Sequence, residues 1–273
     1  DLITIGSLFG LFISSLESIL STSYHLTNGR ALYKSSEELL DLEEEKSEGT
    51  NLIGPLKNIQ IEDLCYSYDG IHMNIDHFVA TIEVGQKILV TGPSGVGKST
   101  LVKCICGMQD DYTGRILING LNVKDIPKRA LRDYVLYVGQ EEKLFSGTIK
   151  ENIVLGQYDE RIFEEVINFC SLEGVLASRI ERENSTILES ASNLSGGERS
   201  RMILARALYR RPRLLIIDET LSSVSEEMED EILKRLLAIE NLTVIYITHR
   251  KKEHLFQNII KLERNDNNEF RKQ

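Results

Sequence analysis

A glycine-rich loop between an apolar run and a helix start is the feature that most constrains this chain. The loop consists of Gly92, Pro93, Ser94, Gly95, Val96, Gly97, Lys98 and Ser99, with Thr100 after it. The preceding run, Lys87–Thr91, is short and apolar and predicts a buried strand. The residues from Thr100 onward predict a helix. A strand, a loop of the form G-x-x-x-x-G-K-[ST] and a helix, in this order, are typical of a phosphate-binding loop.

The chemistry of phosphate binding accounts for each residue type in this loop. The three glycines let the backbone turn tightly, so that N–H groups point inward at a helix N-terminus, where negative charge is favoured. Lys98 can reach the β- and γ-phosphates of a nucleotide, and the Ser99 hydroxyl can ligate Mg²⁺. A glycine-rich turn with a chance lysine is the simpler alternative, and the flanking strand and helix count against it.

Two further apolar runs end in side chains that suit nucleotide hydrolysis. Leu214–Ile217 precedes Asp218 and Glu219, and Thr243–Thr248 precedes His249. Buried parallel strands deliver such groups at their carboxyl ends. We expect Asp218 to hold Mg²⁺, Glu219 to orient and deprotonate the attacking water, and His249 to sense the γ-phosphate. Solvated turn acids and a structural histidine are the simpler alternatives.

The composition limits the possible classes of protein. The chain has 273 residues, 41% of them hydrophobic and 27% charged, which supports one or two folded domains with a sizeable core. Its formal net charge of −10 argues against a general nucleic-acid binder. The charge does not argue against ATP, which such a site binds through local N–H groups, Lys98 and Mg²⁺.

The segment before the acidic strand end resembles a known family signature. Leu194, Ser195, Gly196, Gly197, Glu198 and Arg199 resemble the signature motif of ATP-binding cassette (ABC) ATPases. Gln is usual where this chain has Glu198. A helix predicted over Glu198–Leu208 follows, and its N-terminus can bind a second phosphate face. The resemblance implies that this face binds the γ-phosphate of ATP held by a second copy, in a head-to-tail dimer.

The resemblance extends over residues 56–264 and assigns further roles. Tyr68 resembles the aromatic residue that stacks on adenine, and Tyr66 is the rival, expected to pack inside a strand. Gln140 resembles the glutamine that touches Mg²⁺ and the attacking water. Ser225 stands where the family usually has an Asp that helps to link the two sites, which puts that coupling in question.

The sequence after Gln140 resembles the exporter branch of the family. Phe145–Ile153 matches F-x-G-T-I-x-E-N-I, a region that meets the membrane domain in exporters. Residues 2–16 are apolar and uncharged but shorter than the ~20 residues that span a bilayer. The apolar part of a signal peptide and a buried core helix are alternatives. We expect the cytoplasmic end of a last transmembrane helix, and hence part of a longer transporter.

These observations predict an α/β fold: a P-loop NTPase core with a mainly parallel sheet, an antiparallel β subdomain, a helical signature subdomain and an N-terminal helix. We expect four parts: the end of the membrane helix and its extension at 1–46, a linker at 47–55, the ATP-binding domain at 56–264 and a loose tail at 265–273. Their implied function is ATP hydrolysis that powers export of a peptide, lipid or drug at the cytoplasmic face of the cell inner membrane.

The implied cofactors are ATP and Mg²⁺. The implied partners are a second ATP-binding domain, with which this one forms a homodimer, and the transmembrane domain of the same transporter. A soluble ABC ATPase that acts as a mechanical or regulatory switch is the alternative. A nucleotide-binding module with little hydrolysis is a second rival, supported only by Ser225.

Overall fold

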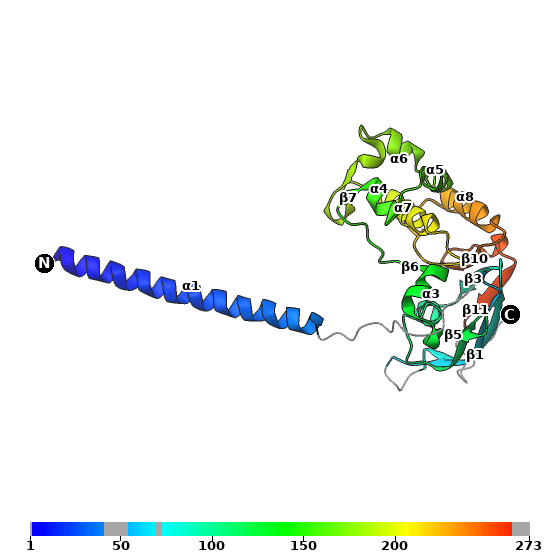
Figure 1. Ribbon diagram of the computed structural model, residues 1–273, viewed down its shortest axis with the longest axis horizontal. Helices are drawn as coiled ribbons and strands as arrows, with labels where there is room; N and C mark the ends of the chain where they lie inside the picture. Colours follow the sequence, from blue (N-terminus) through cyan, green and yellow to red (C-terminus); the bar gives the residue numbers. More distant parts are fainter. Residues whose placement is uncertain (1, 41–53, 69–72, 264–273) are drawn as a thin grey trace. The chain divides into compact units, whose positions relative to one another are not determined.

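The computed structural model describes residues 2–40, 54–68 and 73–263 (Figure 1). The chain divides into two compact units, residues 1–45 and 46–273. Most of the expected linker, and all of the expected tail at 265–273, lie outside the described residues. The limits expected for the four parts therefore stay a prediction.

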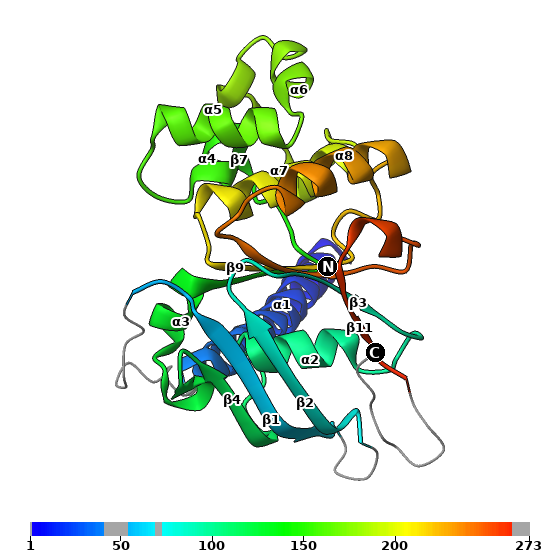
Figure 2. The same cartoon turned by 90° about the vertical axis from the view of Figure 1, so that its right-hand side faces the viewer.

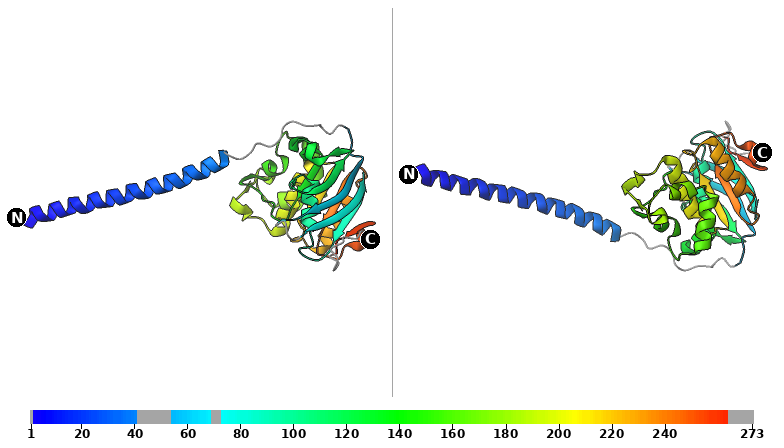
Figure 3. Two further views of the ribbon diagram at one scale, coloured as in Figure 1. Left: turned by 90° about the horizontal axis from the view of Figure 1, so that it is seen from below. Right: turned by 90° about the horizontal axis from the view of Figure 1, so that it is seen from above.

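The first unit is helix α1, Leu2–Leu40, which runs without a break (Figures 1 and 3). Large apolar side chains such as Phe9 and Phe12 are exposed along it. The hydroxyls of Ser15 and Thr22 donate to carbonyls four residues earlier, so the helix itself satisfies these polar groups. Among the helices of the described residues, none combines the length and the apolar character that a bilayer crossing needs.

The second unit is built around a five-stranded parallel sheet with the order β11-β3-β10-β9-β6. Its strands are β3 (Lys87–Thr91), β6 (Val135–Val138), β9 (Leu214–Asp218), β10 (Thr243–Ile247) and β11 (Asn258–Lys261). Every residue of β9 and β10 is buried, because layers cover both faces of the sheet. This confirms the parallel sheet expected from the apolar runs.

One face of this sheet packs against α2 and an antiparallel sheet (Figure 2). Leu214 and Ile216 of β9 share an apolar cluster with Leu101 of α2 (Lys98–Ile105). The antiparallel sheet has the order β2-β1-β4-β5 and contributes to the same cluster. Its strands are β1 (Asn58–Tyr66), β2 (Ile75–Glu83), β4 (Thr113–Ile118) and β5 (Leu121–Asn122).

The other face carries a helical layer. Leu215 and Ile217, the alternate residues of β9, belong to a second apolar cluster together with residues of α7 and α8. The layer contains α4 (Ile149–Val154), α5 (Glu160–Phe169), α6 (Glu173–Ala177), α7 (Gly196–Tyr209) and α8 (Glu226–Leu237), with a small pair of strands, β7 (Gly147–Thr148) and β8 (Thr186–Ile187). Figure 2 shows α7 and α8 on one side of the parallel sheet and α2 on the other.

Short elements complete the second unit. These are α3 (Lys128–Tyr134) and the 3₁₀ turns η1 (Val123–Asp125), η2 (Arg182–Asn184), η3 (Glu189–Ala191) and η4 (Glu253–Leu255). The apolar run from Tyr134 to Val138 predicts a strand, but in the structure Tyr134 ends α3 and β6 begins at Val135. The apolar spacing of Asp159–Ala177 predicts a helix, which Ser171, with a φ of 53°, divides into α5 and α6.

The exporter-like segment is held together by a buried asparagine. Asn152 is fully buried, and its amide group donates to the carbonyl oxygens of Phe145 and Thr148. Its side-chain oxygen accepts from the backbone N–H of Phe145 and from Arg206 of α7. Thr148 and Glu151 form a capping box at the start of α4. Local hydrogen bonding therefore explains several residue types of this motif.

We predict that Asn152→Ala lowers the free energy of unfolding by about 1–3 kcal/mol, because it leaves buried backbone groups without partners. Chemical denaturation of the full chain measures this change. Asn241→Ala is the control, since Asn241 is exposed, and should stay within about 0.5 kcal/mol of wild type. Equal stability of the two variants would contradict the role given to Asn152.

Candidate nucleotide site

The phosphate-binding loop runs from the carboxyl end of β3 into α2. Gly97 is the N-cap of α2 with a φ of 103°, and a Cβ there would lie 2.4 Å from the carbonyl oxygen of Asn74. Gly95 also has a left-handed φ, of 76°. A side chain at Gly97 would clash with Asn74, and glycine adopts the left-handed φ of both positions without strain. Val96 and Thr100 are buried, and Val96 packs into the same apolar cluster as α2, while Pro93 and Ser94 are exposed.

Lys98 is buried beneath this loop. Its ammonium group donates to the carbonyl oxygens of Gly92 and Pro93, both at 2.9 Å. Burial lowers the pKa of Lys98, and the nearby carboxylates of Glu219 and Asp218 oppose that shift. A buried cation held by neutral carbonyls, next to a turn of backbone N–H groups, suits a polyphosphate ligand.

Four of the residues expected from the sequence line one cleft of about 680 Å³. They are Ser99, Gln140, Asp218 and Glu219. A hydroxyl, an amide oxygen and a carboxylate are the hard oxygen donors that Mg²⁺ prefers, so this set fits a magnesium ion beside the phosphate-binding loop. The parallel strands bring the groups together, since the loop follows β3 and the two acids end β9.

Glu219 and His249 lie in contact. Glu219 Oε1 is 2.6 Å from His249 Nε2. The backbone N–H of Glu219 donates to the carbonyl oxygen of Ile247, which holds the ends of β9 and β10 side by side. Glu219 has a left-handed φ of 56°, uncommon for a residue with a side chain and more frequent at functional sites. The contact with an ionised Glu219 requires the hydrogen on Nε2.

Tyr68 and Tyr66 have different environments. Tyr66 is buried at the end of β1, whereas Tyr68 is 57% exposed. The two rings meet edge to face with centroids 4.9 Å apart. The Thr100 hydroxyl lies 3.4 Å from the Tyr68 hydroxyl, which places Tyr68 beside the start of α2. The exposed ring of Tyr68 can therefore offer a face to a ligand, and its role at adenine stays a prediction.

The signature segment lies at the start of α7 and outside the cleft around Ser99. Ser195 is the N-cap, and the helix begins at Gly196, two residues earlier than the sequence pattern predicts. Ser195 Oγ accepts from the N–H of Glu198, and the Glu198 carboxylate accepts from the N–H of Ser195. Either Glu or Gln can complete such a capping box, so Glu198 preserves the local geometry.

Tyr137 is a site residue that the sequence pattern did not reveal. Its hydroxyl donates to Asp218 Oδ2 at 3.0 Å, and it lines the same cleft. Burial, then the neighbouring Asp218 carboxylate, raises the pKa of Tyr137 above its usual range, so the phenol stays a donor. The sequence signal was only its place in a strand three residues before Gln140.

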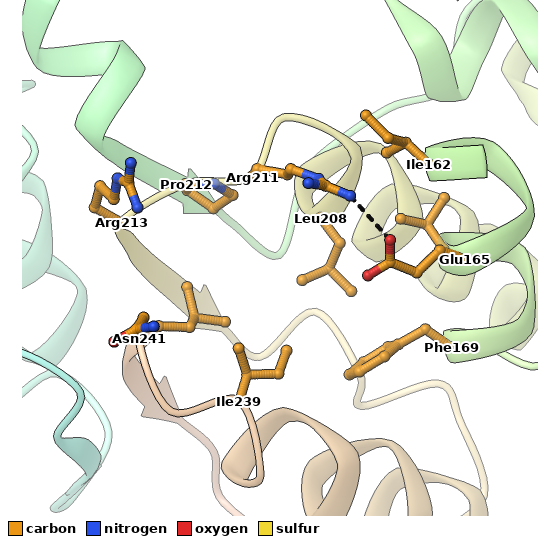
Figure 4. A pocket seen from close by; sticks show the side chains of 11 residues that line it. Ile162, Glu165, Phe169, Leu208, Arg211, Pro212, Arg213, Ile239 and Asn241 are labelled. Carbon is orange, nitrogen blue, oxygen red and sulfur yellow. Dashed lines mark hydrogen bonds and ion pairs between the residues drawn. The ribbon is translucent and has the colours of Figure 1, made fainter. Parts of the chain in front are cut away.

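A second cavity, of about 230 Å³, lies in the helical layer and holds none of the expected site residues (Figure 4). Its lining is mainly apolar and includes Ile162, Phe169 and Leu208. Glu165 and Arg211, which also line it, form an ion pair at 3.0 Å. The residues expected to bind Mg²⁺ lie in the other cleft.

The fold and site together define a P-loop domain that binds a nucleotide. Residues 75–222 match the family model described as ABC transporter, and the chain belongs to this family. The match contains the phosphate-binding loop, Gln140, the signature segment and both strand-end acids.

Relatives and solved structures agree with this assignment. The pediocin PA-1 transport/processing ATP-binding protein PedD of Pediococcus acidilactici is 30% identical over 92% of this chain and 36% of its own length. The colicin V secretion/processing ATP-binding protein CvaB of Escherichia coli is 30% identical over 86% of this chain and 35% of its own length. The chain thus spans about a third of these relatives.

A bacterial Atm1-family ABC exporter with ATP bound has a similar structure, with a TM-score of 0.77 and 25% identity. The similarity covers 86% of this chain and 42% of that protein. It agrees with the α/β fold, with its parallel and antiparallel sheets and helical layer, that the sequence predicted.

We predict that Lys98→Ala weakens ATP binding about tenfold or more, because the charged hydrogen bonds to phosphate are lost. Isothermal titration with ATP measures the affinity. Lys234→Ala removes an exposed lysine of α8 and should bind ATP as wild type does. Normal affinity in Lys98→Ala would contradict the site.

Ser225 now has a structural explanation that can be tested. It caps α8, and its hydroxyl accepts from the N–H of Met228. We predict that Ser225→Asp keeps the free energy of unfolding within about 0.5 kcal/mol, since Asp caps helices as well as Ser does, and that Ser225→Ala lowers it by about 1 kcal/mol. Thermal unfolding of both variants checks this, and a larger loss in Ser225→Asp than in Ser225→Ala would contradict the cap.

Proposed function

We propose that this chain is the ATP-binding and ATP-hydrolysing domain of an ABC exporter. One observation carries the proposal: the ends of β3, β9 and β10 place the phosphate-binding loop, Asp218, Glu219 and His249 at one edge of a parallel sheet. Such an edge is where open α/β sheets bind their ligands. Family membership and the ATP-bound relative support the same ligand.

ATP binding uses groups that the fold already holds in place. Tyr68 stacks on adenine through its exposed ring. The backbone N–H groups from Ser94 to Thr100 and the Lys98 ammonium donate hydrogen bonds to the phosphate oxygens. Ser99, Asp218 and Gln140 would hold Mg²⁺, which neutralises charge on the phosphate oxygens when bound.

Hydrolysis requires a base beside the γ-phosphate. Glu219 accepts a proton from water as the water oxygen attacks phosphorus, and the bond to the ADP oxygen breaks. The 2.6 Å contact with His249 fixes the direction of the carboxylate before the reaction. We assign His249 to the γ-phosphate; where its Nε2–H makes that contact it leaves Glu219, so the imidazole couples the base to the presence of ATP.

A second copy, oriented head to tail, completes the site. The capping box of α7 uses the N–H groups of Ser195 and Glu198. We assign the N–H groups of Gly196 and Gly197 to the γ-phosphate of ATP bound by the other copy. ATP thus holds the two copies together, and hydrolysis releases them.

The exported cargo and the membrane domain lie outside the nucleotide site. We propose a peptide cargo, because relatives are named for pediocin and colicin V, and a location at the cytoplasmic face of the cell inner membrane. The transmembrane domain of the same transporter would contact a groove of about 620 Å³ that includes the exposed Phe145 and Leu155. The exposed apolar side chains of α1 suit the end of a membrane helix.

The central test is Glu219→Gln. We predict that it retains ATP affinity and loses turnover by about a hundredfold or more, since the amide cannot accept the proton. Steady-state release of phosphate and titration with ATP measure the two quantities. Glu240→Gln removes an equal charge from an exposed position and should hydrolyse ATP at the wild-type rate. Unchanged turnover in Glu219→Gln would remove it from the role of base.

A further inference from the structure

A buried carboxylate lies behind the catalytic edge, outside the site described above. Glu229 of α8 is fully buried. Its Oε1 accepts from the Tyr246 hydroxyl at 2.5 Å, and its Oε2 accepts from Arg250 Nη1 at 2.5 Å. Lys252 Nζ lies 3.3 Å from the same Oε2. A buried charge is expensive unless it is paired and fully hydrogen-bonded, and Glu229 meets that condition.

The partners of Glu229 differ in what else they contact. Tyr246 and Lys252 are buried, and Lys252 also donates to Asp230 at 2.5 Å. Arg250 continues beyond Glu229 to the loop between β9 and α8. Its Nη1 donates to the carbonyl oxygen of Val224 at 2.9 Å, and its Nη2 donates to that of Ser222 at 2.7 Å. Among the side chains of the described residues that contact the Glu229 carboxylate, Arg250 is therefore the one that also bonds carbonyls of this loop.

The loop, residues 222–225, begins three residues after the candidate base. The N–H of Ser222 donates to the carbonyl oxygen of Glu219 at 3.1 Å. Arg250 directly follows His249 in the chain and bonds Ser222, which in turn bonds Glu219, so it is linked to both partners of the 2.6 Å contact between Glu219 and His249. Arginine presents several donors in a rigid plane, which lets it hold a carboxylate and two carbonyls together.

The opposite side of the loop touches the signature helix. Ser223 Oγ lies 2.7 Å from Ser200 Oγ of α7, within hydrogen-bond distance. A Cβ at Gly196 would lie 3.2 Å from the Cβ of Ser223, so the start of α7 packs closely on the loop. A displacement of the loop would therefore move the signature segment relative to Glu219.

We propose that Glu229 and Arg250 form a positioning pair that fixes the loop at 222–225, and through it sets the start of α7 relative to Glu219 and His249. The expected change in kcat rests on the proposed ATP hydrolysis. The expected position of the loop rests on its contacts alone. Arg250 bonds two carbonyls of the loop, at Ser222 and Val224, while Ser225 joins the loop to the first turn of α8. The pair acts through the loop and does not contact ATP.

Two variants separate loop positioning from general stability. Arg250→Lys keeps a cation beside Glu229 but cannot reach both loop carbonyls with one point charge. Tyr246→Phe is the matched control, since it removes a hydrogen bond from Glu229 and leaves every contact of Arg250 with the loop in place. A purely structural role predicts that both variants lower thermal stability and that catalytic loss follows stability.

Hydrogen exchange tests the structural claim without any requirement for turnover. The N–H groups of Ser222 and Val224 donate to carbonyls inside this turn, at 3.1 and 3.0 Å. We predict that both exchange about tenfold faster in the Arg250→Lys chain than in wild type, as the loss of roughly one hydrogen bond requires, and at the wild-type rate in Tyr246→Phe. Equal exchange in wild type and Arg250→Lys would overturn the proposal.

Kinetics then tests the consequence for hydrolysis. We predict that Arg250→Lys lowers kcat about tenfold with ATP affinity unchanged, because the phosphate-binding loop and Tyr68 are untouched, and that Tyr246→Phe keeps the wild-type kcat. Loss of kcat in proportion to thermal stability in both variants would overturn the positioning role. Absence of turnover in wild type would instead count against the proposed hydrolysis, and the exchange result would still decide the inference.

Discussion

The parallel pairing of β10 between β3 and β9 is the constraint on which the site depends. Ile247 of β10 is in register with Val90 of β3 and with Asp218 of β9, so the three strands end at one level. A shift of one residue would turn the apolar side chains of β9 to the wrong layers, since Leu214 and Leu215 face opposite clusters. The burial that stabilises the sheet therefore also fixes where the proposed catalytic groups at its strand ends lie.

The helical layer adds a second constraint, which concerns the relation between the two halves of the proposed nucleotide site. The signature segment belongs to α7, whereas Glu219 and His249 belong to the sheet. Between them lies one short turn, held by Arg250 on one side and by Ser200 on the other. On the Arg250 side the connection consists of hydrogen bonds to backbone carbonyls, and on the α7 side it is a contact between two serine hydroxyls.

The core of the fold could be predicted because its signals are local. The apolar runs around Leu89, Ile216 and Ile245 are continuous and predict buried strands. The glycines of the phosphate-binding loop predict a tight turn, and Ser195 precedes a capped helix. The structure confirms these elements, and it brings Ser99, Gln140, Asp218 and Glu219 to one cleft. The roles assigned to them at ATP stay predictions.

The remainder could not be predicted, because it depends on contacts between distant residues or on one backbone angle. The contact of Tyr137 with Asp218 joins residues 81 apart, and that of Arg250 with Glu229 joins residues 21 apart, with no periodic pattern to announce either. The left-handed Ser171 divides a helix whose apolar pattern is continuous.

The most direct test of the shared site is the mass of Glu219→Gln in solution by light scattering, with ATP and Mg²⁺ and then with ADP. We predict twice the nucleotide-free mass with ATP and no change with ADP. An unchanged mass at saturating ATP would contradict the shared site.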